Sequence, residues 1–154
     1  MRVAVACDHG GYALKDTVLS AIREAGHEPL DLGTNSHDPV DYPDYAHAAA
    51  LAVQRGEVAR AVVICGSGVG AAVVANKLRG VRAGVCHDGY SAHQGVEHDD
   101  LNVLALGARV IGSAVAADLV RTFLAAHFTG EERHRRRLEK ISAIEREVNG
   151  RRKA

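Results

Sequence analysis

The regular alternation of short strand-like runs with helical patterns is the feature that most constrains how this chain can fold. Runs of mainly apolar, β-favouring residues recur along the sequence, separated by helical patterns. We predict strands at Val3–Cys7, His27–Leu32, Ala61–Cys65, Arg82–Cys86 and Asn102–Leu106. Such alternation is typical of a parallel sheet whose right-handed crossovers cover both faces with helices. We therefore expect an α/β fold, and the length of 154 residues favours a single domain.

Helical patterns occupy most of the intervals between these runs. We predict helices at Tyr12–Ala25, Pro43–Arg55, Val69–Leu78 and Ser91–Glu97, then one capped by Ser113 and a last one from Glu131 to Val148. No strand follows the last helix, so its apolar stripe needs a partner on its own domain or on a second subunit. The predicted domain spans residues 1–150, and residues 151–154 are a basic tail that we expect to fray.

Polar side chains gather where the predicted strands end. In open parallel sheets, ligands bind beyond the carboxyl ends of the strands. Asp8 and His9 follow the first strand, the loop that starts at Cys65 follows the third, and His87 and Asp88 follow the fourth. His98, Asp99 and Asp100 lie just before the fifth strand, on a predicted loop. We expect one edge of the sheet to collect nearly all of this chemistry.

The loop after the third strand carries alternating glycines, Gly66, Gly68 and Gly70, with Ser67 between the first two. Its backbone N–H groups can form an anion hole, although a tight strand-to-helix turn needs small residues as well. The spacing differs from a dinucleotide fingerprint, and no Gly-Lys-Ser/Thr follows as in a nucleotide P-loop. The loop also lacks the arginine of a thiol phosphatase.

Cys65 stands directly before this loop, where a thiolate can serve as nucleophile or general base. The alternative is a small buried apolar residue, which is what we expect of Cys7 and Cys86. Three cysteines without paired spacing indicate free thiols in a reducing compartment. We find no signal-peptide pattern and no apolar run of membrane-spanning length, so we expect a cytoplasmic protein.

Basic residues near the C-terminus form the second candidate site. Arg133 and Arg137 share a helix face beside His134, and with Arg109 they can clamp a phosphate or simply form a solvated basic face. A net charge of zero and few aromatic residues argue against nucleic-acid binding. His98 lies beside two acids, as an oriented acid–base or as a loop histidine bonded to a carboxylate. The histidines lack metal-ligand spacing, so we predict no metal.

Four segments together resemble the ribose-5-phosphate isomerase B family, which includes the galactose-6-phosphate isomerase subunits. They are CDHGGYALK at 7–15, DYPDYA at 41–46, ICGSGVGAAVVANK at 64–77 and EHDDLNVLALGARVIG at 97–112. The resemblance runs from residue 1 to about residue 150. It implies a Rossmann-like three-layer sandwich around a five-stranded parallel sheet, with an extra C-terminal helix. It also implies dimers or dimers of dimers, with a site shared between subunits and no cofactor.

The resemblance also implies roles for individual residues. Cys65 would move a proton between C1 and C2 of a sugar phosphate, while N–H groups of Gly66, Gly68 and Gly70 hold the enediolate. His98 would open the furanose ring with help from Asp8. The residues implied to contact the rest of the substrate are Ser67 and Tyr42 at the sugar, and His9, Arg109, Arg133, His134 and Arg137 at the phosphate.

Asp99 departs from the family pattern, in which many members have Asn. An amide can donate to a substrate oxygen, whereas an ionised carboxylate can only accept. We expect an aldose–ketose isomerase that converts D-ribose 5-phosphate to D-ribulose 5-phosphate. A six-carbon substrate such as allose or galactose 6-phosphate, or a non-catalytic sugar-phosphate sensor, are the alternatives. One chain carries the cysteine, the histidine and the arginines, which favours a homo-oligomer.

Overall fold

A five-stranded parallel sheet forms the centre of the protein, as predicted. The computed structural model describes residues 1–151. Its strands are β1 (Arg2–Cys7), β2 (Glu28–Asp31), β3 (Arg60–Cys65), β4 (Ala83–Val85) and β5 (Val103–Gly107). Their order is β2-β1-β3-β5-β4, and all neighbouring pairs are parallel. In this register Cys65 pairs with Gly107 on β5, which brings two of the predicted site segments together at the carboxyl edge.

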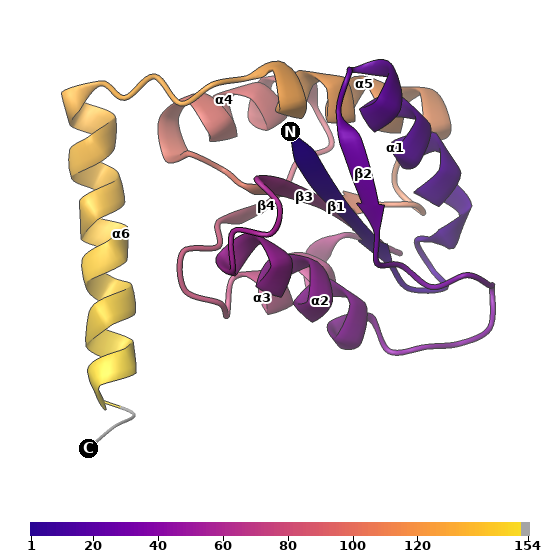
Figure 1. Ribbon diagram of the computed structural model, residues 1–154, viewed down its shortest axis with the longest axis horizontal. Coiled ribbons are helices and arrows are strands. Elements are labelled where there is room, and N and C mark those ends of the chain that lie inside the picture. The colour runs from indigo at the N-terminus through magenta and orange to yellow at the C-terminus, as the bar shows by residue number, and fades with distance from the viewer. Residues whose placement is uncertain (152–154) are drawn as a thin grey trace.

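Helices cover both faces of the sheet (Figure 1). They are α1 (Tyr12–Glu24), α2 (Tyr42–Gln54), α3 (Val69–Ala75), α4 (Gly89–Asp99), α5 (Ser113–Ala125) and α6 (Glu132–Arg151). Strand side chains alternate between two cores: Val3 and Val5 pack with α1, α4 and α5, whereas Ala4 and Ala6 pack with α2 and α3. The second core is rich in alanine, so α2 and α3 lie close to the sheet. The α/β sandwich is therefore confirmed.

Two helix boundaries differ from the sequence prediction in ways that matter for the site. α4 begins at Gly89, because the Asp88 carboxylate caps it by accepting from the Ser91 N–H at 2.7 Å, and it runs on to Asp99. His98 and Asp99 therefore lie in its last turn and not on a loop. The predicted cap of α5 is also wrong: Gly112 occupies the cap position, without a side-chain hydrogen bond.

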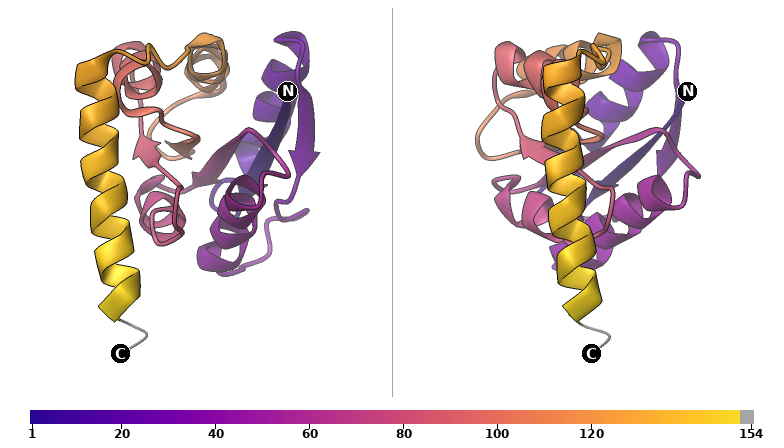
Figure 2. Two further views of the ribbon diagram at one scale, coloured as in Figure 1. Left: turned by 60° about the vertical axis from the view of Figure 1, so that its left-hand side comes forward. Right: turned by 90° about the vertical axis from the view of Figure 1, so that its left-hand side faces the viewer.

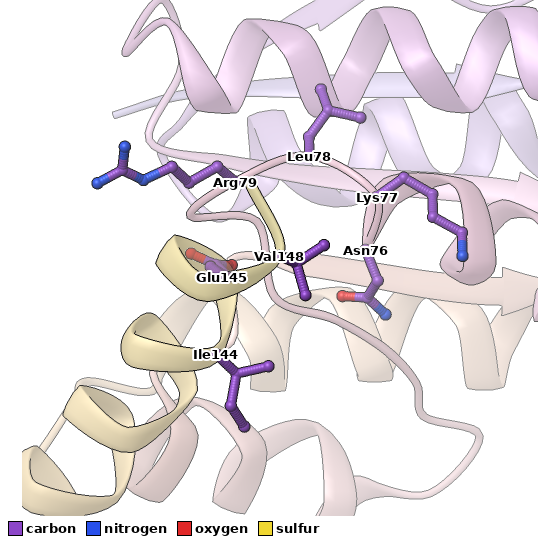
Figure 3. Close-up of a pocket in the computed structure, with 7 residues that line it drawn as sticks. All are labelled: Asn76, Lys77, Leu78, Arg79, Ile144, Glu145 and Val148. Carbon is purple, nitrogen blue, oxygen red and sulfur yellow. The ribbon is translucent and has the colours of Figure 1, made fainter. Parts of the chain in front are cut away.

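The last helix, α6, lies beyond β4 and beside α4 (Figure 2). Its apolar stripe faces the loop after α3, where a pocket is lined by Asn76, Lys77, Leu78 and Arg79 and, from α6, by Ile144, Glu145 and Val148 (Figure 3). The Glu145 carboxylate accepts a hydrogen bond from the Gly80 N–H at 3.1 Å. Ile144 and Val148 nevertheless remain 61% and 50% exposed. A single chain thus covers only part of the stripe.

The last helix reaches further than the sequence predicts. α6 continues to Arg151 rather than ending at Val148, and the rest of the predicted basic tail lies outside the described residues. Within residues 1–151, no helix is long and apolar enough to cross a membrane.

A buried lysine ties the loop between β2 and α2 to the sheet. Lys15 on α1 is 4% exposed, and its ammonium lies 2.8 Å from the carboxylate of Asp31 at the end of β2. It also donates to the Thr34 carbonyl and to Asn35 Oδ1, both at 2.8 Å. A buried charge needs such partners. Lys15 therefore fixes the start of the loop that leads to Tyr42.

We expect Lys15→Met to lower the free energy of unfolding by about 1–3 kcal/mol, because charged hydrogen bonds of this kind contribute that much. Urea denaturation measures the loss, and hydrogen exchange at residues 34–40 should accelerate. Lys140→Met, at an exposed position on α6, is the matched control. Unchanged stability and unchanged exchange in Lys15→Met would show that the lysine does not anchor the loop.

Candidate active site

A pocket of about 360 Å³ opens at the carboxyl edge of the sheet. Segments that follow β1, β3 and β5, together with the start of α2, supply its walls. The lining residues are Asp8, Tyr42, Cys65, Gly66, Ser67, Gly70, Arg109 and Val110. All except Val110 were among the residues proposed from the sequence. The pocket brings together a thiol, a carboxylate, a hydroxyl and a guanidinium.

Cys65 is the last residue of β3, and its side chain is 5% exposed. Its Sγ accepts a hydrogen bond from the Gly68 N–H at 3.1 Å. The turn that makes this contact needs glycine at 68, because φ there is 81° and a Cβ would lie 3.0 Å from the Leu106 carbonyl carbon. One of the three predicted N–H donors is thus used on the thiol itself.

Neighbouring loops pack their backbones directly against this turn. A Cβ at Gly11 would lie 2.2 Å from the Ile64 carbonyl oxygen, and one at Gly107 would lie 2.7 Å from the Ser67 carbonyl group. Asp8 is 7% exposed, and its Oδ1 accepts from the Gly11 N–H at 2.9 Å. These contacts place the Asp8 carboxylate beside the glycine loop and leave its second oxygen for another partner.

The other walls come from α2 and from the loop after β5. The Tyr42 ring lies against Gly70, where a Cβ would be 2.8 Å from the ring. His9 Nδ1 accepts from the Val40 N–H at 3.1 Å and so joins the loop before α2 to the loop after β1. The Arg109 N–H donates to the Gly66 carbonyl at 3.0 Å, and its guanidinium lies beside Gly66. Predicted sugar and phosphate contacts therefore share one rim.

The remaining predicted residues form a second cluster around the end of α4 and the start of α6. The rings of His98 and His134 are stacked, with centroids 4.2 Å apart and an interplanar angle of 28°. His134 is 1% exposed, and Arg133 Nε donates to its Nε2 at 3.2 Å. Burial lowers the pKa of His134, and the neighbouring His98 and Arg133 lower it further. Arg137 adds positive charge nearby.

This cluster lies at the opposite edge of the sheet from the pocket. α4 starts after the carboxyl end of β4 and runs back, so its last residues reach the amino end of that strand. Arg82, just before β4, confirms this by donating through Nε to the Asp99 and Asp100 carbonyls at 3.0 and 2.8 Å. We expected the carboxyl edge of the sheet to hold nearly all the candidate site residues. This is wrong for His98 and Asp99, because α4 extends to Asp99 and places both residues near the amino edge.

Residues 1–151 contain no group of three or more His, Cys, Asp or Glu side chains arranged to hold a metal ion. The three cysteines are free thiols. The thiol, the carboxylate and the hydroxyl of the pocket can exchange protons, and its guanidinium and backbone N–H groups can bind anions.

Comparison with known proteins assigns the chain to a family. A family model described as ribose/galactose isomerase matches residues 3–141. The chain belongs to this family. Ribose-5-phosphate isomerase B of Escherichia coli strain K12 is 45% identical over 148 residues, which cover 96% of this chain and 99% of the relative. The chain is thus a sugar-phosphate aldose–ketose isomerase, and the predicted family is confirmed.

Solved structures agree with this assignment. A ribose-5-phosphate isomerase B from Clostridium thermocellum superposes with a TM-score of 0.93 at 44% identity, covering 96% of this chain and 99% of the other. The enzyme from Mycoplasma genitalium, solved with bound ribulose-5-phosphate, gives a TM-score of 0.89 at 34% identity, covering 95% and 97%. The isomerase fold therefore spans nearly the whole chain.

Sequence reasoning missed three residues of the two clusters in this isomerase. Val110 lines the pocket, Gln94 contacts His98, and the Thr129 hydroxyl lies 2.7 Å from His134 Nδ1. Gln94 precedes His98 by four residues on one helix, so extending the predicted helix to His98 would have revealed that pair. No sequence signal connects Thr129 with His134, because the contact depends on how the segment before α6 turns.

We expect iodoacetamide at pH 8 to modify Cys65 before the other cysteines, with parallel loss of isomerase activity. Alkylation requires the thiolate. Burial raises the pKa of Cys7 to about 11 and also raises that of Cys86, so both stay protonated, whereas Cys65 lines the pocket. Peptide mass spectrometry measures the order of labelling, with Cys65→Ala as the control. Labelling of Cys7 or Cys86 at the same rate would contradict it.

Proposed function

We propose that this isomerase interconverts D-ribose 5-phosphate and D-ribulose 5-phosphate, with Cys65 as the base. The observation that carries the proposal is the position of Cys65 Sγ in a pocket that Asp8, Ser67 and Arg109 also line. A pentose phosphate needs a proton carrier at its carbonyl end and positive charge at its phosphate end. The 45% identity with ribose-5-phosphate isomerase B supports this choice of substrate.

The chemistry follows from the pocket. Cys65 takes the proton from C2 of the open-chain aldose, and the electrons move into an enediolate. The proton then returns to C1, while a proton from the C2 hydroxyl ends on O1, so the substrate and product differ only in where hydrogen sits. Stabilising the negative charge of the intermediate is the largest task. Because the Gly68 N–H is bonded to the thiol, this task falls to N–H groups of Gly66 and Gly70 and to Ser67.

The Ser67 hydroxyl is suited to that task. Its Oγ accepts from the Val69 N–H at 3.2 Å, so its own proton is available to a substrate oxygen. Asp8, the only buried carboxylate among the described residues, exchanges protons with the sugar hydroxyl or ring oxygen during ring opening. Tyr42 closes the sugar side of the pocket, and His9 accepts from the Val40 N–H in the loop that leads to it.

A complete site requires two copies of the chain. The cysteine pocket and the His98 cluster lie at opposite edges of one sheet. A second copy must therefore bring its own His98 cluster to Cys65 of the first. This cluster consists of His98, Asp99, Arg133, His134 and Arg137. Two apolar side chains beside the pocket, Val69 and Val110, are 55% and 56% exposed in the single chain. Their exposure supports a second subunit that covers this surface. The half-exposed stripe of α6 supports the same arrangement. We therefore propose a homodimer, or a dimer of dimers, with sites between subunits.

The alternative substrate is a six-carbon phosphate such as allose or galactose 6-phosphate. The observation behind this alternative is Asp99, whose exposed side chain departs from the amide of the family pattern and, when ionised, can only accept a hydrogen bond from a substrate hydroxyl. Comparing kcat/KM for ribose 5-phosphate, allose 6-phosphate and galactose 6-phosphate distinguishes the substrates. A higher value for either hexose phosphate would overturn the choice of ribose 5-phosphate.

Cys65→Ala should abolish isomerisation of ribose 5-phosphate, because loss of a general base costs about 10²–10⁴-fold in rate or more. Arg137→Ala should mainly raise KM, because it removes positive charge without touching the reacting carbons. Steady-state kinetics with each purified variant measures both effects. A Cys65→Ala variant with near wild-type kcat would rule out the cysteine as base. If the wild-type protein binds ribose 5-phosphate but exchanges no solvent deuterium into it, the protein is a sensor and not an isomerase of this sugar.

Mixing two inactive variants tests the shared site. Cys65→Ala and His98→Ala should each be inactive alone, whereas unfolding and refolding them together should restore roughly a quarter of wild-type activity by random pairing in a two-fold dimer. Each mixed dimer then holds one site with both residues intact. The control refolds each variant alone. No recovery in mixtures that contain mixed dimers would place both residues of each site in one subunit.

A further inference from the structure

His98 has a partner that the family resemblance did not suggest. Gln94 lies one helical turn earlier on α4, and its amide Nε2 is 2.8 Å from His98 Nδ1. The spacing of four residues places both side chains on one face of the helix. Nδ1 of His98 is therefore occupied by an amide, which can donate through its NH₂ group or, after rotation, accept through its oxygen. For the other ring nitrogen, Nε2, the described residues provide no hydrogen-bond partner.

The second neighbour of His98 is held as a neutral ring. Arg133 Nε can only donate, so Nε2 of His134 must accept and carries no proton. The Thr129 hydroxyl donates to the Glu97 carbonyl at 3.2 Å, which leaves its lone pairs to accept from His134 Nδ1–H at 2.7 Å. Both ring nitrogens of His134 are thus committed. The stacked ring offers His98 a flat neutral surface in place of a competing charge.

Other charged groups surround this pair. From α6 and the segment before it come Arg133, Arg137 and Glu131, all of which act on His134. The last residue of α4 is Asp99, and Asp100 follows it as the cap. Arg82 donates to both of their carbonyls and pairs with the Asp100 carboxylate at 2.7 Å. The side chain of Glu97 pairs with His93 at 3.3 Å, and its carbonyl is bonded to Thr129. None of these groups replaces Gln94 at Nδ1 of His98.

We propose that Gln94 is a positioning residue that commits His98 to proton exchange through Nε2, with His134 as the neutral support of the ring. This inference rests on the proposed function, in which His98 opens the furanose ring. Ring opening breaks the bond between C1 and the ring oxygen. The C1 hydroxyl loses its proton and becomes the aldehyde carbonyl. The ring oxygen gains a proton and becomes the C4 hydroxyl, so no proton is gained or lost overall. A histidine that serves this step needs one nitrogen fixed and the other directed at the sugar.

A pair of substrates separates ring opening from enolisation. Ribose 5-phosphate is mainly cyclic, whereas ribulose 5-phosphate has no ring, because its O5 carries the phosphate. Loss of Gln94 should therefore slow isomerisation of ribose 5-phosphate but spare the exchange of C1 hydrogen of ribulose 5-phosphate with solvent deuterium. A general loss of folding or of substrate binding would slow both.

We expect Gln94→Leu to lower kcat for ribose 5-phosphate about tenfold, since a misdirected general acid–base loses part of its 10²–10⁴-fold contribution. Deuterium exchange into ribulose 5-phosphate should stay near the wild-type rate. Gln94→Glu keeps a partner at Nδ1, so it should restore most of the ring-opening rate and move the pH profile of kcat/KM to higher pH, because a carboxylate favours the imidazolium. His93→Leu, one residue earlier and 50% exposed, is the matched control.

The kinetic results separate failure of the Gln94 positioning role from failure of the proposed function. Equal losses on both substrates in a folded Gln94→Leu variant, or no loss on either, would overturn the positioning role. If Gln94→Leu fails to fold by circular dichroism, an unshifted pH profile in Gln94→Glu overturns it instead. If the wild type neither exchanges deuterium into ribulose 5-phosphate nor isomerises ribose 5-phosphate, the proposed function itself fails.

Discussion

Direct backbone contact around the turn from β3 to α3 organises the active-site edge of this protein. A Cβ at Gly11 would clash with the Ile64 carbonyl, and one at Gly107 would clash with Ser67. Gly68 has a positive φ of 81° and lies against Leu106. Three parallel strands can therefore end side by side with no side chains separating their loops. The Cys65 thiol, the Asp8 carboxylate and the glycine N–H groups meet in one pocket because of this packing.

The same parallel topology also divides the chemistry. α4 runs back from the carboxyl edge towards the amino edge of the sheet, so residues at its two ends lie at opposite edges within one chain. Its cap, Asp88, follows the carboxyl end of β4, whereas His98 lies in its last turn on the far side. Association of two copies is the simplest way to join His98 to Cys65, and the exposed stripe on α6 provides apolar surface for it.

Electrostatics distinguishes the two stacked histidines. Burial lowers the pKa of His134 below its ordinary value, and the neighbouring His98 and Arg133 lower it further. Both of its ring nitrogens are also hydrogen-bonded. His98 is less buried and has an amide at one nitrogen. Two similar residues placed 4.2 Å apart thereby acquire different roles, with one ring supporting the other. The position of His134 also means that a direct phosphate contact would cost it an existing partner.

The fold class, the five strands and most of the cysteine pocket could be predicted from the residues alone. Strand periodicity is local, and carboxyl ends of parallel strands must meet, so the sequence places Asp8 and the Cys65 loop together. Arg109 was grouped with Arg133 and Arg137 instead, and the structure puts it in the Cys65 pocket. The place of His98 and its neighbours, in contrast, depends on how the elements pack in three dimensions. The extent of α4 depends on the Asp88 cap and on Arg82, and the Thr129–His134 contact joins segments with no shared pattern. Such contacts depend on packing between elements, which periodicity does not encode.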